Sequence, residues 1–167
     1  MYKKHGTNQK ALEMKQLKFS DEMAIAIGEG RKTQTRRVVD PQPVFDEDSG
    51  YIYFGDEMLD LHDVDRLIEL CPYGKVGDNF TVLKKTLKFK DIRIERLHDI
   101  SEDDAKAEGV MDQFEKHGIP KSGSISWYAK NDFRHIWQSI YPEHPKKAWE
   151  LNPYVWVIEF EKNTENK

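Results

Sequence analysis

The stretch GRKTQTRRVV, residues 30–39, is the part of the chain from which we infer the fold. Ahead of it, Ser20 predicts the start of a helix, because its side-chain oxygen can accept a hydrogen bond from the first turn. Gly28 and Gly30 predict the end of that helix, since glycine readily adopts the left-handed backbone that closes helices. The β-branched residues within the stretch then predict a strand. A helix end and a strand start therefore meet inside one basic segment.

The same stretch carries four cationic side chains around two threonines. A solvated basic turn is the ordinary interpretation of such a run, and an anion or nucleotide site is the alternative. Lys32 and Thr35 are three positions apart, so on a regular strand their side chains would point to opposite faces. They can meet only where the backbone is irregular, which Gly28 and Gly30 make possible.

Two strands and a short helix are expected in the middle of the chain. Phe80–Lys90 and Ile92–Leu97 mix apolar and charged side chains in a pattern that predicts two strands. Ser101 begins the helix, and Asp104 resembles the acidic partner of a capping box. Glu108 lies at the C-terminal end of this helix, where the helix dipole slightly disfavours a carboxylate. Its position hints that Glu108 has a purpose other than helix stability.

The C-terminal part predicts one helix and one central strand. Apolar side chains between Phe133 and Tyr141 follow helical spacing, and Pro142 stops the helix. Tyr154–Glu161 carries aromatic and β-branched side chains on both faces, which is typical of a strand in the middle of a sheet. These elements favour a mixed α/β (α+β) fold, a small β-barrel flanked by helices, over a doubly wound sheet.

The chain of 167 residues suits one domain with insertions. Within the first insertion, Tyr51–Phe54 predicts a short strand and Asp63–Leu70 a short helix. We expect a flexible N-terminal tail over residues 1–15 and a C-terminal tail over residues 163–167. Between them we expect one domain, residues 16–162, with insertions at about 41–72 and 109–132.

Composition excludes several classes of protein. The chain has 26 Lys+Arg against 30 Asp+Glu, and a net charge of -4 argues against a wholly basic nucleic-acid coat, though not against a local basic patch. One cysteine rules out an internal disulfide framework and fits a reducing, cytoplasmic compartment. No apolar run reaches the ~18 residues of a membrane span, so we expect no membrane partner. His62 and Cys71 belong to no recognised metal motif, and we expect no metal and no other cofactor.

Taken in order, several segments resemble the ASCH-domain proteins, which have a PUA-like β-barrel fold. The matching segments are residues 20–37, Lys75–Asp78 running on to Val82, Ile100–Glu108, and Ile140–Pro142 with Tyr154–Phe160. They cover roughly half of the chain. The chain looks most like the longer ASCH proteins of bacteriophages and prophages, because Asn152-Pro153 precedes the last strand.

The resemblance implies a catalytic set. Small bacterial members of the family are amidohydrolases that remove the acetyl group from N4-acetylcytidine, and their lysine, threonine and glutamate match Lys32, Thr35 and Glu108. Thr35 Oγ would attack the amide carbonyl, with Lys32 as its base or as a positioning cation. Glu108 would bind the cytosine edge or shuttle a proton to the leaving nitrogen. Alternatively, Glu108 would activate a water that Thr35 only orients.

Further residues are expected to bind the substrate: Arg31, Thr33, Arg37, Lys84 and Lys85. The lysine-rich run from Lys84 to Lys90 is more ordinarily an edge strand protected by lysines than a track for RNA. Trp127 is the best candidate for stacking on a base. Three hypotheses follow: a nucleoside hydrolase, an RNA- or nucleotide-binding module without catalysis, and a metal-independent ribonuclease. The expected partner is a small nucleoside or RNA, and the sequence does not indicate the oligomeric state.

Overall fold

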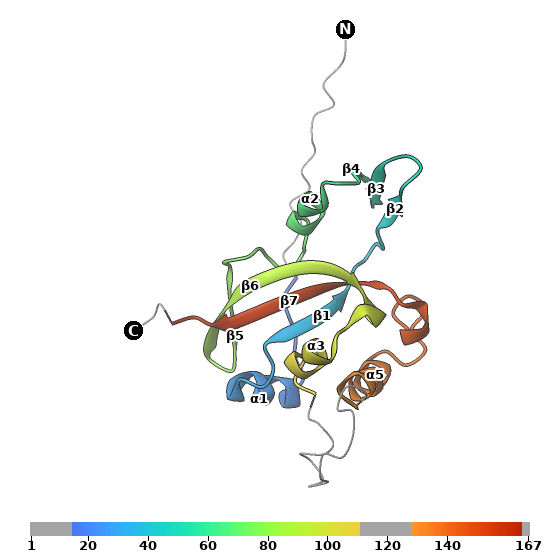
Figure 1. The fold of residues 1–167 in the computed structure, drawn as a ribbon. Coiled ribbons are helices and arrows are strands. Elements are labelled where there is room, and N and C mark those ends of the chain that lie inside the picture. The colour runs from blue at the N-terminus through green and yellow to red at the C-terminus, as the bar shows by residue number, and fades with distance from the viewer. Residues whose placement is uncertain (1–14, 111–127, 165–167) are drawn as a thin grey trace.

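The central feature of the computed structural model, which describes residues 15–110 and 128–164, is a curled four-stranded antiparallel sheet (Figure 1). The strands stand in the order β1 (Gln34–Val38), β7 (Tyr154–Lys162), β6 (Lys85–Arg96) and β5 (Asn79–Val82). β7 lies in the interior of the sheet, as its two apolar faces predict. β1 and β5 form the two edges of this sheet.

Helices pack against both faces of the sheet. α1 (Asp21–Glu29) contributes to the cluster on one face, together with Trp156 and Ile158 of β7. α3 (Glu102–Ala107) and α5 (Tyr128–Ile140) contribute to the cluster on the other face, with Val155 and Val157. Two single turns, η1 (Leu97–Asp99) and η3 (Trp149–Leu151), stand beside the ends of β6 and β7.

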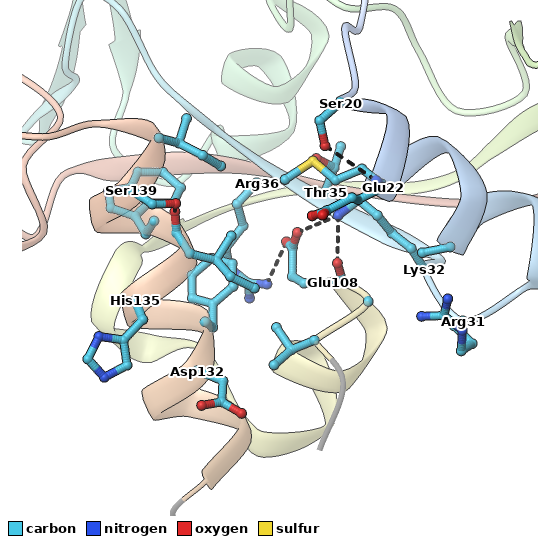
Figure 2. Close-up of a pocket in the computed structure, with 18 of the residues that line it drawn as sticks. Ser20, Glu22, Arg31, Lys32, Thr35, Arg36, Glu108, Asp132, His135 and Ser139 are labelled. Carbon is cyan, nitrogen blue, oxygen red and sulfur yellow. Dashed lines mark hydrogen bonds and ion pairs between the residues drawn. The ribbon is translucent and has the colours of Figure 1, made fainter. Parts of the chain in front are cut away.

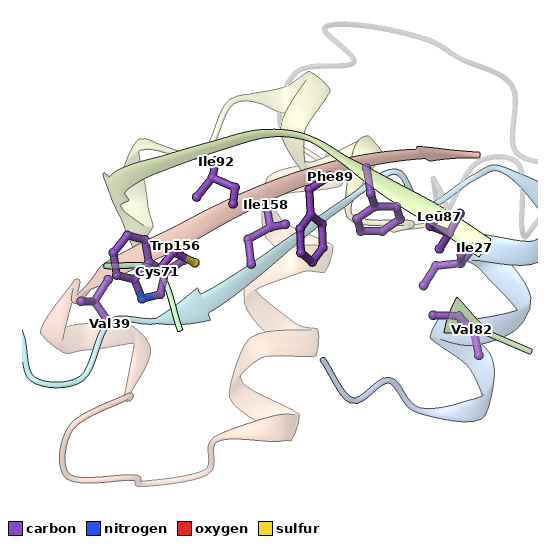
Figure 3. Packing of buried hydrophobic residues seen from close by; sticks show 11 residues of the cluster. Ile27, Val39, Cys71, Val82, Leu87, Phe89, Ile92, Trp156 and Ile158 are labelled. Carbon is purple, nitrogen blue, oxygen red and sulfur yellow. The ribbon is translucent and has the colours of Figure 1, made fainter. Parts of the chain in front are cut away.

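Strand β7 holds the core together because its side chains enter both clusters. Val155, Trp156, Val157 and Ile158 are at most 1% exposed. Figure 3 shows the cluster on the α1 side, where Phe89 and Ile92 of β6 join Trp156 and Ile158. Burying one such apolar side chain contributes about 1.5–3 kcal/mol, so this strand stabilises the fold more than its length suggests.

The first helix begins and ends where its sequence predicts. The side-chain oxygen of Ser20 accepts a hydrogen bond from the N–H of Met23 at 3.3 Å. Gly30 closes the helix with φ +80°, a left-handed conformation in which glycine avoids the steric cost of a Cβ. The short helix α3 has the expected capping box as well, with Ser101 and Asp104 bonding each other's backbone. These local predictions are confirmed.

The segment after β1 forms a separate small sheet. Its strands are β2 (Val44–Asp46), β3 (Tyr51–Phe54) and β4 (Glu57–Asp60), followed by α2 (Val64–Glu69). Ile52, Leu59 and Leu67 form its own small core. Figure 1 shows this sheet projecting from the body on the side away from α1 and α5. The predicted strand at Tyr51–Phe54 and the predicted helix at Asp63–Leu70 are confirmed, the latter with Asp63 as its cap.

The prediction of one strand over Phe80–Lys90 is wrong, because the chain reverses in the middle of that range. Leu83 and Lys84 have φ +47° and +64°, and Val82 stands opposite Lys85. Two residues with positive φ between paired strands form a tight hairpin turn, a position usually filled by Asn-Gly. Neither residue is a turn former, so the sequence did not reveal the turn. The predicted strand at Ile92–Leu97 falls in the second half of the 12-residue β6, except for Leu97, which begins η1.

The coarse fold prediction, a mixed α/β domain with a small curled sheet flanked by helices, is confirmed. The PUA-like identity of that sheet and the domain boundaries stay predictions. Residues 1–13 and the greater part of the 109–132 insertion lie outside the described residues. No helix in the described parts of the chain is long and apolar enough to cross a membrane.

Candidate active site

A cleft of about 800 Å³ opens along the outer edge of β1, between α1, the end of α3 and α5 (Figure 2). Lys32, Thr35 and Glu108 all line it. Their exposed fractions are 2%, 1% and 9%. The three residues singled out from the sequence therefore lie together at the bottom of one cleft, shielded from bulk water.

The backbone between α1 and β1 explains how Lys32 and Thr35 reach the same cleft. The N–H groups of Arg31 and Lys32 both donate to the carbonyl of Ala26, at 2.9 and 3.1 Å, and β1 begins only at Gln34. Lys32 thus stands before the alternation of the strand starts, and its side chain is not forced onto the face opposite Thr35. The expected irregularity of the backbone at Lys32 is confirmed.

Glu108 reaches the cleft because the end of α3 lies directly against Lys32. The N–H of Thr33 donates to the carbonyl of Ala107 at 2.8 Å, and Lys32 and Glu108 form an isolated antiparallel bridge. Gly109 then turns the chain away with φ +83°. A Cβ at this glycine would lie 2.8 Å from the Cβ of Lys32, which is too close for any side chain. The close approach of the two segments therefore requires glycine at position 109.

Lys32 and Glu108 form a buried ion pair. Lys32 Nζ donates to Glu108 Oε2 at 2.8 Å, to the Glu108 carbonyl at 2.9 Å and to the Gln34 carbonyl at 2.8 Å. These bonds use all three ammonium hydrogens. Burial lowers the pKa of Lys32 below its ordinary value, although the charge and hydrogen bond of Glu108 act in the opposite direction. The charges of Arg37 and Arg36 lower that pKa further.

Arg36 is the functional candidate that the sequence reasoning missed. Its Nη1 lies 3.2 Å from Glu108 Oε1, and its Nη2 lies 3.0 Å from Glu95 Oε2 and 3.3 Å from Asp104 Oδ2. Its side chain is 0% exposed. Glu108 is therefore held by a cation on each carboxylate oxygen, Lys32 on one and Arg36 on the other. No local signal identifies Arg36, because its partners Glu95 and Glu108 lie 59 and 72 residues away in the chain.

The ion-pair network continues beyond the cleft. Arg93 of β6 lies 2.5 Å from Glu95, 3.0 Å from Asp104 and 2.6 Å from Glu159. Burial acts to raise the pKa of Asp104, but hydrogen bonds from Ser101 and the charge of Arg36 outweigh it and lower that pKa. Asp104 is thus favoured in its charged form, and Asp104 and Glu95 together hold Arg36 in position beside Glu108.

Two of the expected substrate-binding residues lie at the cleft. Arg31 and Arg37 both line it, and Arg31 pairs with Glu29. Arg37 lies over the ring of Phe19, 5.3 Å from its centroid, and donates to the carbonyl of Lys18 at 2.7 Å. Both arginines approach from the rim, where a charged group of a ligand would meet them first.

The structure does not bring the other three to the cleft. The side chain of Thr33 is exposed, and Lys84 occupies the hairpin turn. Lys85 Nζ donates to the carbonyl of Gly28 at 2.8 Å, near the C-terminal end of α1. The edge-strand interpretation of these lysines is also wrong, because Lys85 begins β6, which is paired on both sides. Trp127 lies outside the described residues.

Helix α5 forms the wall facing Lys32 and Glu108. Its apolar stripe divides: Phe133 and Trp137 are buried in the core, whereas Ile136 and Ile140 are 37% and 45% exposed. The polar residues of this wall are Asp132, His135 and Ser139. The stripe is wider than the core contact needs, and its outer part faces the cleft.

Metal ligands do not gather at this site or elsewhere in residues 15–110 and 128–164, where no group of three His, Cys, Asp or Glu could hold an ion. Cys71 is buried in the cluster on the α1 side, and burial raises the pKa of its thiol to about 11. His62 is exposed in the small insertion. The cleft therefore offers an ion pair, a hydroxyl and cationic rim groups as its reactive chemistry.

Comparisons with known protein families and with curated proteins find no match. Among solved structures, the fold is similar to the crystal structure of protein EF3133 from Enterococcus faecalis V583, assigned to family DUF984. The sequence identity is 16%, the match covers 89% of this chain and 81% of that one, and the TM-score is 0.44. A likeness of this size carries no argument about the site.

Proposed function

We propose that this protein is a hydrolase that removes the acetyl group from N4-acetylcytidine or a related modified nucleoside. One observation carries the proposal: Lys32 and Glu108 form a buried pair at 2.8 Å that lines one cleft with Thr35. The apolar side of the α5 wall offers a surface for a flat base, and polar groups converge opposite it. We also propose that the chain is an ASCH-domain protein with a PUA-like fold.

The buried environment makes the lysine a better base. A lysine with an ordinary pKa of about 10.4 is neutral in only one of ~2,500 molecules at pH 7, and reaching that state costs about 4–5 kcal/mol. Burial lowers the pKa of Lys32 and so reduces this cost. The carboxylate of Glu108, 2.8 Å away, can accept the proton without an external base.

The proposed reaction begins when Thr35 Oγ attacks the acetyl carbonyl and gives its proton to the Lys32–Glu108 pair. The bond between the acetyl carbon and N4 then breaks, and the pair returns the proton to N4. Cytidine departs, and the acetyl group remains on Thr35 as an ester. Water hydrolyses the ester, which releases acetate and restores the hydroxyl. Cationic Lys32 and Arg36 would stabilise the oxyanion of each step. In the alternative, Glu108 activates the water directly and no ester forms.

The test is release of cytidine from N4-acetylcytidine, followed by chromatography. Thr35→Val and Glu108→Gln preserve side-chain shape, and we expect each to lower turnover by roughly 100-fold or more. Lys106→Met is the control at a site outside the cleft, since Lys106 is a half-exposed lysine that pairs only with its neighbour Asp103 among the described contacts. An acetyl adduct on Thr35 would support the ester route. Absence of cytidine release by the unmodified protein refutes the proposal.

One observation favours a second candidate, an RNA- or nucleotide-binding module without catalysis. All three hydrogens of the Lys32 ammonium are already accepted by protein oxygens, as expected of a pair that joins β1 to α3 for stability. Salt-sensitive binding of RNA without cytidine release would favour this module. Cleavage of single-stranded RNA in the presence of a chelator would instead indicate a metal-independent ribonuclease.

A further inference from the structure

The small sheet β2–β3–β4 exposes an apolar face that residues 15–110 and 128–164 do not cover. The register places Val44, Tyr53 and Met58 directly opposite one another in one row across the three strands. Their exposed fractions are 58%, 40% and 59%. In the next row on the same face, Tyr51 stands between Asp46 and Asp60.

The inner face of this sheet already has its core. Ile52 and Leu59 alternate with the outward residues and pack on Leu67 of α2. A sheet with one buried face needs polar residues on the other, so the outward apolar row serves no packing in the described chain. The cross-strand contacts of Tyr53 with Val44 and Met58 can each stabilise the sheet by about 0.2–1 kcal/mol, but they do not explain the charges around them.

The charge of this segment is unlike that of the rest of the chain. Residues 41–70 contain nine Asp and Glu and a single Arg, whereas the remaining residues contain 25 Lys and Arg against 21 Asp and Glu. The net negative charge of the protein thus comes from this one projection. Hydrogen bonding with the side chain and backbone of Ser49 lowers the pKa of Asp46, which keeps this carboxylate charged. A cationic partner is favoured, and the phosphate backbone of a nucleic acid is repelled.

The two rows also fit a particular spacing. Rows 44/53/58 and 46/51/60 are two residues apart along each strand, or about 6.6 Å. Side chains at alternate positions of an extended peptide have the same spacing. If an apolar side chain of such a peptide packed on the row of Val44, Tyr53 and Met58, a cationic side chain two residues along would lie over the ring of Tyr51. The carboxylates of Asp46 and Asp60 would then stand on either side of that cation.

From this arrangement we infer that the outer face of the β2–β3–β4 sheet binds a basic protein segment in extended conformation. The segment carries an apolar side chain and an arginine or lysine at alternate positions of one face. This binding does not depend on the proposed hydrolase activity, because it uses none of the cleft residues.

Fluorescence anisotropy with a labelled synthetic peptide of Val-Ser-Arg-Ser repeats tests the inference. The matched probe carries Glu in place of each Arg. We expect the full-length protein to bind the arginine peptide only, and the double variant Asp46→Asn with Asp60→Asn to weaken that binding roughly fivefold or more. Both Asn side chains can still accept the turn N–H bonds, so the small sheet stays folded. Glu161→Gln, at the exposed end of β7, is the charge control and should bind as the unmodified protein does.

Met58→Thr tests the apolar row, and it should weaken binding while the thermal unfolding of the protein is retained. Equal binding of both peptides, no binding of either, or no effect of the paired Asn variant overturns the inference. Binding of duplex DNA that is lost in the Met58 variant would also overturn it. A concentration-dependent dimer abolished by Met58→Thr would show that a second copy occupies the face, and would overturn it equally.

Discussion

Gly109 allows the geometry of the cleft to be tested apart from its chemistry. It has φ +83°, and a Cβ added there would lie 2.8 Å from the Cβ of Lys32. Lys32 cannot retreat easily, because its N–H donates to Ala26 and the next N–H donates to Ala107. We predict that Gly109→Ala pushes Lys32 away from Glu108 and lowers the free energy of unfolding.

Gly30 provides the matched control for the size of this effect. Its φ is +80°, it also follows a helix, and nothing lies within 4 Å of an added Cβ. Gly30→Ala should therefore cost only the strain of a left-handed alanine, about 1–2 kcal/mol. Gly109→Ala adds overpacking of about 1–3 kcal/mol, so we expect a loss of about 2–5 kcal/mol.

Urea unfolding followed by tryptophan fluorescence measures both losses. Under the proposed function, the Gly109 variant should also lose cytidine release, whereas the Gly30 variant should keep it. Equal losses of stability in the two variants would refute the reasoning, because they would mean that Lys32 does not press against position 109. If the Gly109 variant released cytidine at the unmodified rate, Lys32 would not take part in the reaction.

Three further predictions concern the ion pairs and the hairpin. Because burial lowers the pKa of Lys32, the unfolded chain holds a proton that the folded chain has released, so the free energy of unfolding should rise with pH up to about 10.4. Lys32→Met should lack this rise, and identical pH slopes would contradict the shift. Arg36→Met should lower the free energy of unfolding by about 3–5 kcal/mol, since it leaves buried Glu108 with one cation, and a loss under about 1 kcal/mol in a urea titration would count against a dry network. Replacing Leu83-Lys84 by Asn-Gly should raise the free energy of unfolding by about 1 kcal/mol, because both residues have positive φ. Urea unfolding measures the change, and a lower free energy would show that the native side chains make stabilising contacts.

Local chemistry explains why several elements could be predicted from the sequence. A serine hydroxyl two or three residues from an N–H needs no distant partner to cap a helix, and Ser20 and Ser101 both do so. Gly30 ends α1 for the same local reason. The two apolar faces of Tyr154–Lys162 required burial on both sides, which only an interior strand provides.

Distant contacts explain what the sequence analysis missed. Arg36 meets Glu95 and Glu108 across 59 and 72 residues of chain, and nothing near Arg36 in sequence indicates which carboxylates it will find. The turn at Leu83-Lys84 was missed because the pairing of β5 with Lys85–Lys88 of β6 imposes positive φ on two residues that do not favour it.

The candidate site combines both kinds of information. The sequence by itself determined that Lys32 and Thr35 can meet only if the backbone before Thr35 is irregular, and resemblance to a family pointed to Lys32, Thr35 and Glu108. Only the tertiary structure decided that these two charges share a hydrogen bond in a buried cleft and that Arg36 completes their set. The physical reason is that hydrogen bonds within a turn depend on neighbours in the chain, whereas the pairing of buried charges depends on distance in space and on exclusion of water.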